Sequence, residues 1–119
     1  MIVFTLPKPP STNRLYKRLL VRNKAGHMRR PRTKEYEKWR ELAGWMIIEQ
    51  RSKQDKRIEG NYKMTFTLEP CGLDLGNAEK ACSDLLQSMG IIDNDKFARE
   101  INMRWGEVKG CRIELEAVS

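Results

Sequence analysis

The chain has 119 residues, a length that predicts a single domain spanning residues 1–119. It is 39% hydrophobic and 33% charged, and no apolar run is long enough for a membrane span or a signal peptide. We therefore expect an intracellular, cytoplasmic protein without a membrane partner. Its net charge of +7 is concentrated, because residues 14–34 carry nine basic side chains and no acidic one. Such a segment is typical of proteins that bind phosphate backbones, and the alternative is a solvated basic loop without a ligand.

The first half of the chain predicts one strand and one long helix. Apolar residues alternate over 2–6, which predicts a strand, and the basic segment that follows is expected to be a loop or ribbon. Thr33 can cap a helix that runs to about Arg51 on a 3.6-residue apolar period. Core burial is the default for this apolar face, and a subunit interface is the alternative. The face comprises Tyr36, Trp39, Ala43, Met46, Ile47 and Gln50, widened by Leu42 and Trp45.

The second half predicts three strands and a second helix. Residues 62–68 alternate as a strand, and Asn77 is expected to cap a helix that ends at Gly90. Ile91 and Ile92 are expected to re-enter the core. Alternation over 101–105 and 111–117 predicts two closing strands, joined as a hairpin. The order strand, helix, strand, helix, strand, strand indicates an α+β domain with a mixed β-sheet and helices packed on it.

The cysteines and the histidine exclude two other classes of small domain. Cys71, Cys82 and Cys111 are odd in number and scattered, which fits reduced thiols and argues against a disulfide framework. None of them has a neighbour at zinc-ligand spacing, and His27 is the only histidine. A zinc site is therefore not expected.

Two aspartates are placed where a metal ion can bind. Asp74 lies in the glycine-rich loop before the second helix, and Asp95 lies in the turn beyond it. If the chain folds back along the helix after Gly90, the two carboxylates can meet. Paired carboxylates in a cationic protein suit Mg²⁺, which promotes phosphodiester hydrolysis by activating water and neutralising charge. The alternative is that each aspartate makes only local hydrogen bonds in its turn.

Lys80 is expected one turn into the second helix, on the polar side of its apolar stripe. It can serve as a cation near a scissile phosphate. The alternative is an ordinary solvated lysine, paired with Asp84 four residues further on.

Two motifs resemble the RusA family of Holliday junction resolvases. That family carries a D-L-D-N-x-x-K run that opens a helix, followed by an acid-rich turn after a glycine. The matching segment here runs from Leu73 to Asp95 and contains D-L-G-N-A-E-K. The P-P-S-T-N-R of residues 9–14 also resembles the family's P-P-S-x-N-R. Because the length and the order of elements agree as well, the resemblance covers nearly the whole chain.

The resemblance implies a homodimeric, Mg²⁺-dependent crossover junction endodeoxyribonuclease of phage or prophage type. Such an enzyme resolves four-way junction DNA by paired symmetric nicks in recombination and repair, and it has no small-molecule substrate. Asp74 and Asp95 match catalytic, metal-binding aspartates, Asp93 is a further candidate metal ligand, and Lys80 matches the catalytic lysine. DNA contacts are assigned to Asn77 and to a basic arm. The arm residues are Asn13, Arg14, Lys17, Arg18, Arg29, Arg30 and Arg32.

Gly76 departs from the family pattern, because RusA proteins have a second aspartate there. Its absence removes one metal ligand and one negative charge. Three outcomes are open: Asp93, Glu79 or Glu69 substitutes, water fills the position, or the protein binds junctions without cutting them well. The leading hypothesis is a junction-resolving nuclease, and the alternative is a catalytically weak or inactive branched-DNA-binding protein of the same fold. An RNA-binding protein is a more distant alternative, since no RNP-type aromatic motif is present.

Overall fold

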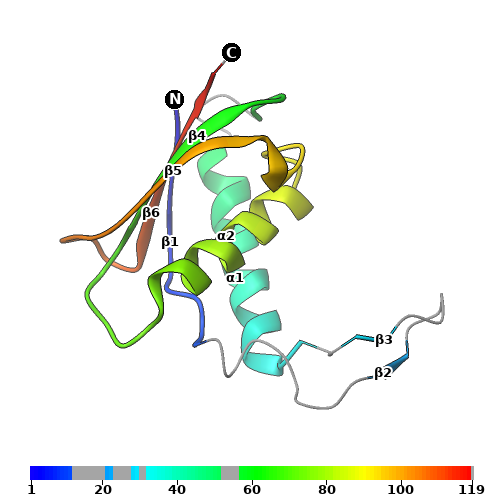
Figure 1. The fold of residues 1–119 in the computed structure, drawn as a ribbon. Helices are drawn as coiled ribbons and strands as arrows, with labels where there is room; N and C mark the ends of the chain where they lie inside the picture. Colours follow the sequence, from blue (N-terminus) through cyan, green and yellow to red (C-terminus); the bar gives the residue numbers. More distant parts are fainter. Residues whose placement is uncertain (12–20, 23–27, 30–31, 52–56, 119) are drawn as a thin grey trace.

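The computed structural model describes residues 1–11, 21–22, 28–29, 32–51 and 57–118. Within these ranges the chain is α+β, and the predicted order of the main elements is confirmed (Figure 1). No helix in them is long and apolar enough to cross a membrane. The elements are β1 (Ile2–Leu6), β2 (Val21–Arg22), β3 (Met28–Arg29), α1 (Lys34–Arg51), β4 (Tyr62–Leu68), α2 (Leu75–Ser88), the 3₁₀ turn η2 (Asp95–Phe97), β5 (Ala98–Trp105) and β6 (Cys111–Ala117).

Four strands form a mixed sheet in the order β1-β6-β4-β5, while β2 and β3 pair as a separate ribbon in the basic segment. β6 is antiparallel to β1 and to β4, and β5 is parallel to β4. The predicted hairpin between the last two strands is therefore wrong. Helix α2 provides the crossover that parallel strands require, so β5 lies beside β4 and not beside β6. The chain then crosses the end of β4, where Gly106 N–H donates to Leu68 O and Glu69 N–H donates to Gly110 O.

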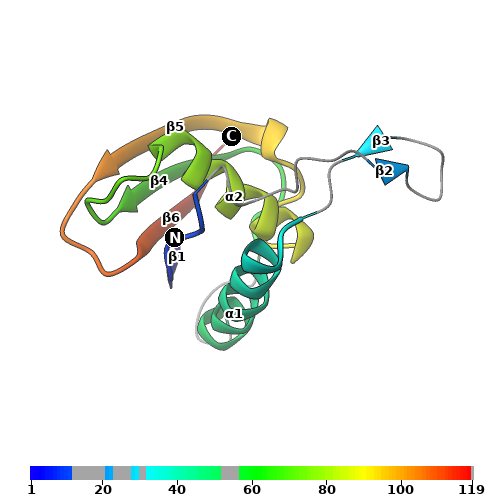
Figure 2. The ribbon, with the colours of Figure 1, turned by 90° about the horizontal axis from the view of Figure 1, so that it is seen from below.

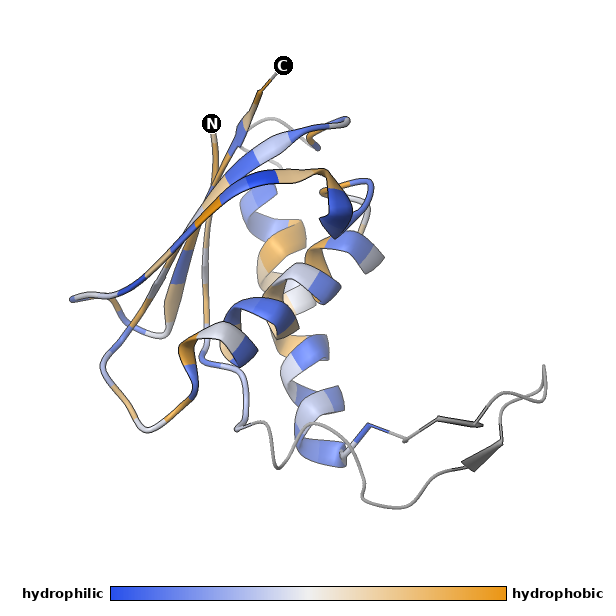
Figure 3. Cartoon of the chain, in the orientation of Figure 1, coloured by the Kyte–Doolittle hydropathy of each residue, from blue (hydrophilic) through white to orange (hydrophobic). Residues whose placement is uncertain are grey.

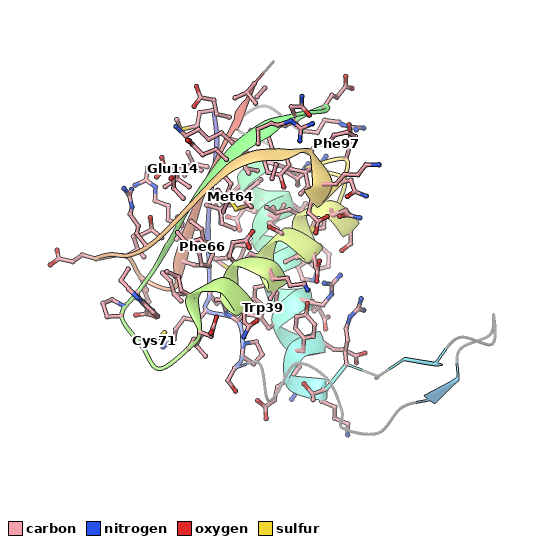
Figure 4. All side chains as sticks on the ribbon, viewed as in Figure 1. Trp39, Met64, Phe66, Cys71, Phe97 and Glu114 are labelled. Atoms are coloured by element: carbon pink, nitrogen blue, oxygen red, sulfur yellow. The ribbon has the colours of Figure 1, made fainter. Side chains whose placement is uncertain are left out.

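Both helices cover one face of the sheet, as Figures 1 and 2 show. Met64 and Phe66 lie between the sheet and the helices, and Glu114 lies on the opposite face (Figure 4). In Figure 3 the apolar stretches of the helices lie where they meet each other and the sheet. The core residues of the strands are Ile2, Phe4, Leu6, Tyr62, Met64, Phe66, Leu68, Cys111, Ile113 and Leu115, and those of the helices include Tyr36, Trp39, Ala43, Ile47, Ala81, Cys82, Leu85 and Leu86.

Helix α1 begins as predicted, because the Thr33 hydroxyl accepts a hydrogen bond from Tyr36 N–H at 3.2 Å. Trp39 (Figure 4) ties the helix to the end of β1 by donating from Nε1 to Pro7 O at 2.8 Å. The predicted widening of the buried face is wrong. Leu42 and Trp45 are 54% and 66% exposed, since they lie on the side of α1 that no other described element covers.

Helix α2 begins three residues earlier than predicted. Asp74, and not Asn77, is the N-cap, and its carboxylate accepts a hydrogen bond from Asn77 N–H at 3.0 Å. Aspartate and asparagine cap equally well, so the sequence alone did not distinguish them. Gly90 stops the helix as predicted, with a φ of 73° that favours glycine. Ile91 and Ile92 then return to the core, as expected.

Candidate functional site

Asp74 and Asp95, the two predicted catalytic aspartates, lie toward opposite ends of α2. Asp74 caps the N-terminus. Asp95 opens η2, and its backbone N–H donates to the Gln87 side chain near the C-terminus of α2 at 3.2 Å. A helix of 14 residues rises about 20 Å. The chain does fold back after Gly90, so that the charge of Asp95 acts on Glu79 and Asp84, but no interaction found in the described ranges links the carboxylates of Asp74 and Asp95.

Asp93, the third predicted metal ligand, is bound by protein groups. Its carboxylate forms an ion pair with Arg57 and accepts a hydrogen bond from Gly60 N–H at 3.0 Å. The backbone hydrogen bond, followed by the charge of Arg57, lowers the pKa of Asp93. The role of these contacts is structural, because they fasten the segment after α2 to the start of β4.

Glu69, one of the acids considered as a substitute for the missing aspartate, is also engaged. Its carboxylate lies 3.5 Å from the Lys8 ammonium and accepts a hydrogen bond from Gly110 N–H at 3.2 Å. These contacts join the ends of β1, β4 and β6. Of the three candidate substitutes, Glu79 is therefore the one whose carboxylate has no basic side chain bound to it in the described structure.

Glu79 is a buried carboxylate in the middle of α2, only 9% exposed. It accepts a hydrogen bond from the Ser83 hydroxyl, one turn further along, at 2.5 Å. Burial raises the pKa of Glu79, Ser83 opposes that effect, and the negative charges of Asp95 and Asp84 raise the pKa further. The fold therefore holds an acid where its charged form is disfavoured.

Glu79, Asp84 and Asp95 form what we call the α2 acidic group. Burial and then the charge of Asp95 raise the pKa of Asp84, while the nearby cations Lys80, Arg40 and Arg32 lower it. No three acidic, histidine or cysteine side chains in the described part of the chain are arranged to hold one metal ion. Mg²⁺ is often held by only one or two carboxylates and retains several waters, so two carboxylates of the group would be enough for a hydrated ion.

The charges of the α2 acidic group also act on Tyr62. Its hydroxyl is buried and has no hydrogen-bond partner among the described residues. Burial, followed by the charges of Glu79 and Asp95, raises the pKa of Tyr62 to about 12. An unsatisfied buried hydroxyl costs about 1–3 kcal/mol. Ordered water in the shell of an ion at the acidic group would supply the missing partner.

A hollow of about 310 Å³ between α1 and α2 brings basic side chains to the acidic group. The guanidinium carbons of Arg32 and Arg40 lie 6.0 and 5.6 Å from the ring centre of Tyr36. Arg40 also donates to the Ser88 hydroxyl at 2.7 Å. Arginine binds phosphate oxygens through a planar pair of donors, so the hollow suits a phosphate. The lining residues are Arg32, Tyr36, Arg40, Asp84, Gln87 and Ser88.

The other predicted site residues are only partly placed. Lys80 is exposed on α2, on the polar side as expected, and its charge acts on Glu79 and Asp84. Asn77 lies in the first turn of α2, and the backbone of Arg29 lies in β3. The predicted DNA-binding residues Asn13, Arg14, Lys17, Arg18 and Arg30 lie outside the described residues.

Sequence reasoning did not single out Arg40, which lines the hollow, or Tyr62, whose buried hydroxyl lies unpaired among the described residues. Arg40 stands among other charged residues in the predicted helix α1, where a lysine or arginine is usually solvated. Tyr62 belongs to the alternating pattern of β4, which explains its burial but not the unpaired hydroxyl.

No protein-family model and no curated protein sequence matches this chain. The resemblance to RusA resolvases therefore rests on the sequence alone, chiefly on the two motifs in residues 9–14 and 73–95.

Proposed function

We propose that this chain is a Mg²⁺-dependent endonuclease of RusA type, which resolves four-way DNA junctions by paired nicks in the cytoplasm of a bacterial or phage-infected cell. The α2 acidic group beside the arginine-lined hollow supports this proposal best. Metal-dependent phosphodiester hydrolysis needs carboxylates for the ion and cations for the phosphate within one site. The residues on α1, α2 and η2 combine both.

Asp95 is the carboxylate best suited to hold the ion. It is exposed, and its charge acts on both other members of the α2 acidic group. Glu79 or Asp84 supplies the second carboxylate. A bound Mg²⁺ would activate water and neutralise charge on the phosphate. In this proposal Glu79 replaces the family aspartate that is absent at Gly76.

The cations bind and orient the DNA. Arg32 and Arg40 hold a backbone phosphate in the hollow, and Lys80 is a cation at its acidic side. The basic arm within residues 14–34 adds further phosphate contacts, which favour recognition of DNA shape over base sequence. Asp74 is assigned to catalysis by its motif alone, because it caps the end of α2 that lies away from Asp95.

A cleavage assay tests the proposal. The protein is incubated with Mg²⁺ and either a four-way junction or a linear duplex of matching sequence, and symmetric nicks are expected only in the junction. Asp95→Asn should reduce nicking at least about 100-fold, because the carboxylate loses its charge and its affinity for the ion. The matched control is Glu116→Gln, which removes an exposed carboxylate from the open face of β6 and should leave nicking unchanged.

Two outcomes of this assay contradict the proposal. If the wild-type protein yields no paired nicks at any concentration, the chain is not a junction-resolving nuclease. If Asp95→Asn nicks at the wild-type rate, the α2 acidic group is not the catalytic site.

The second candidate function is junction binding with little or no cutting. It is favoured by Gly76 and by the lack of a three-ligand arrangement in the described ranges. This candidate requires tighter binding to a four-way junction than to linear duplex, with a steep dependence on salt. Equal affinity for the two substrates would exclude a junction-selective role of either kind.

A further inference from the structure

A second hollow, of about 350 Å³, lies next to the arginine-lined hollow at the crossing of α1 and α2 (Figure 1). Its apolar lining comes from both helices, with Trp45 and Ile48 on α1 and Leu85 and Met89 on or just after α2. Trp45 and Ile48 are three residues apart, so they lie on one face of α1. Gly44 also lines the space and adds no side chain to it. We call this space the Trp45 hollow.

Trp45 is largely exposed, although tryptophan offers more apolar surface for burial than most side chains. The indole is 66% exposed and Ile48 is 48% exposed, whereas Leu85 is only 3% exposed. Covering exposed apolar surface is favourable in free energy, and an indole stacks well with another flat ring. The Trp45 hollow therefore suits a ligand group that is flat and mainly apolar.

The Trp45 hollow is continuous with the arginine-lined hollow, because Arg40 and Ser88 line both. The Arg40 guanidinium donates to the Ser88 hydroxyl at 2.7 Å, so these two side chains form a shared wall. Glu41 lines the Trp45 hollow alone, and its negative charge disfavours a phosphate there. One ligand that occupies both hollows would therefore place a phosphate near Arg32 and Arg40 and a flat ring against Trp45.

We propose that the Trp45 hollow binds a DNA base that has left the base stack, while the arginine-lined hollow holds a phosphate of the same strand. Every nucleotide carries both groups, a flat ring and a phosphate. Stacking of a base on an aromatic side chain is favourable and tolerates any base, because every base has a π-face. The contact therefore recognises an unstacked nucleotide and not a base sequence.

This inference rests on the proposed function and names the part of branched DNA that the site recognises. In a linear duplex the bases are paired and stacked inside the helix. A branch point interrupts that stack, so a base there leaves it at a lower cost. The Trp45 hollow would thus add a preference for branched DNA that phosphate contacts alone do not supply.

Two labelled oligonucleotides of about eight nucleotides test the stacking contact by fluorescence anisotropy without Mg²⁺. One carries thymine at every position, and the other has the same number of phosphates but only abasic positions. The wild-type protein should bind the thymine strand at least about fivefold more tightly than the abasic strand. Trp45→Ala should remove most of this difference and leave the affinity for the abasic strand unchanged. Trp45→Phe keeps a flat ring and should keep most of the preference.

Two matched controls separate stacking from general apolar or ionic attraction. Leu42→Ala removes a 54% exposed apolar side chain of α1 that does not line the Trp45 hollow, so the preference for thymine should persist. Arg32 lines only the arginine-lined hollow, so Arg32→Ala should weaken the binding of both strands by the same factor. Circular dichroism confirms that each variant is folded.

Four results would overturn the inference. The first is equal affinity of the wild-type protein for the two strands, and the second is a preference that Trp45→Ala leaves intact. The third is an equal loss of preference in Leu42→Ala, which would indicate general apolar attraction. The fourth is a Trp45→Ala variant that binds DNA as the wild type does but sediments at a different mass, which would assign the hollow to contacts between proteins.

The inference and the nuclease proposal fail separately. The oligonucleotide experiment contains no Mg²⁺ and measures no cleavage, so a protein that does not nick junctions can still show the preference for bases. Loss of that preference leaves the α2 acidic group in place, where Asp95→Asn tests it.

Discussion

At the scale of single residues, Glu79 links stability to the proposed metal site. Burial raises the pKa of its carboxyl, so folding favours the protonated form. The stability that Glu79 contributes is complete below its ordinary pKa of 4.5 and is lost as the pH rises through the higher pKa of the folded state. Above the pKa of the folded state the protein therefore holds a charge that its fold disfavours, and a bound cation would relieve that penalty.

Glu79→Gln should raise the melting temperature by a few degrees at neutral pH. The amide oxygen can still accept the Ser83 hydrogen bond, while the buried charge is gone. The advantage should shrink as the pH falls below about 4.5, where Glu79 is protonated in either state. Added Mg²⁺ should stabilise the wild-type protein more than the variant, because an ion that binds only the folded state raises stability.

The matched control for this experiment is Glu116→Gln, at an exposed position on β6. It should show neither the gain at neutral pH nor the reduced response to Mg²⁺. If Glu79→Gln and the wild-type protein share one stability profile against pH, the buried charge has no energetic cost. An equal response to Mg²⁺ in both would remove Glu79 from the metal site.

The sequence predicted the residues of the site only in part. Asp74 and Asp95 were recognised because acids in turns next to a helix stand out against the apolar pattern. Glu79 was one of three equal candidates, because the helical period does not say which acids find a basic partner. The ion pairs that engage Glu69 and Asp93 come from Lys8 and Arg57, which lie far away in sequence. Only the packed fold shows which of Glu69, Glu79 and Asp93 has a basic side chain bound to its carboxylate.

At the scale of elements, the N-terminus of α2 is where the capping role of Asp74 can be distinguished from a catalytic role. Asp74 accepts the hydrogen bond from Asn77 N–H that caps the helix. Asp74→Ala should lower the free energy of unfolding by about 1 kcal/mol through loss of the cap. Asp74→Asn keeps a side-chain oxygen that caps equally well, so its stability should be close to that of the wild-type protein.

Asp74→Ala and Asp74→Asn together separate the effect of the lost cap on stability from the effect of the lost charge on cleavage. If the motif assigns Asp74 to catalysis correctly, Asp74→Asn abolishes nicking of a junction while binding stays intact, since it removes only the charge. Denaturant unfolding, junction binding and cleavage are measured side by side for both. Full cleavage by Asp74→Asn would mean that Asp74 acts as a cap alone. Parallel loss of binding and stability in this variant would likewise assign it a structural role.

Element types were predictable from the sequence, but element neighbours were not. Alternation over residues 101–105 correctly predicted a strand, yet the same pattern fits a hairpin with β6 and a parallel pair with β4. The crossover through α2 places β5 parallel to β4. The direction of that crossover depends on how α2 packs against the sheet. Alternation places Ile101, Met103 and Trp105 on one face of that strand. They are exposed because the sheet extends beyond its helices at this edge.

At the scale of the whole molecule, the excess positive charge lies in one segment, and the sheet and helices are formed mainly by the rest of the chain. The α+β fold could be predicted from the apolar periodicity of the sequence. The chain outside residues 14–34, which includes the four-stranded sheet and most of both helices, has no excess of basic over acidic residues. The net charge of +7 comes from residues 14–34, whose nine basic side chains outweigh a slightly acidic remainder. Arg32 stands at the end of this segment and lines the hollow beside Asp84. Under the proposed function, the basic segment and the hollow belong to one DNA-binding surface, to which Arg32 contributes.

Arg40→Ala tests whether the hollow belongs to that DNA surface. Each phosphate contact releases bound counterions, so its loss should reduce the slope of log K against log salt by about 1 and weaken junction binding irrespective of base sequence. The matched control is Lys109→Ala, an exposed cation in the turn between β5 and β6, which should leave the slope unchanged. Fluorescence anisotropy with a labelled junction over a range of salt concentrations gives both slopes. An unchanged slope for Arg40→Ala would assign Arg40 to its contacts with Ser88 and Tyr36 and exclude the hollow from the DNA-binding surface.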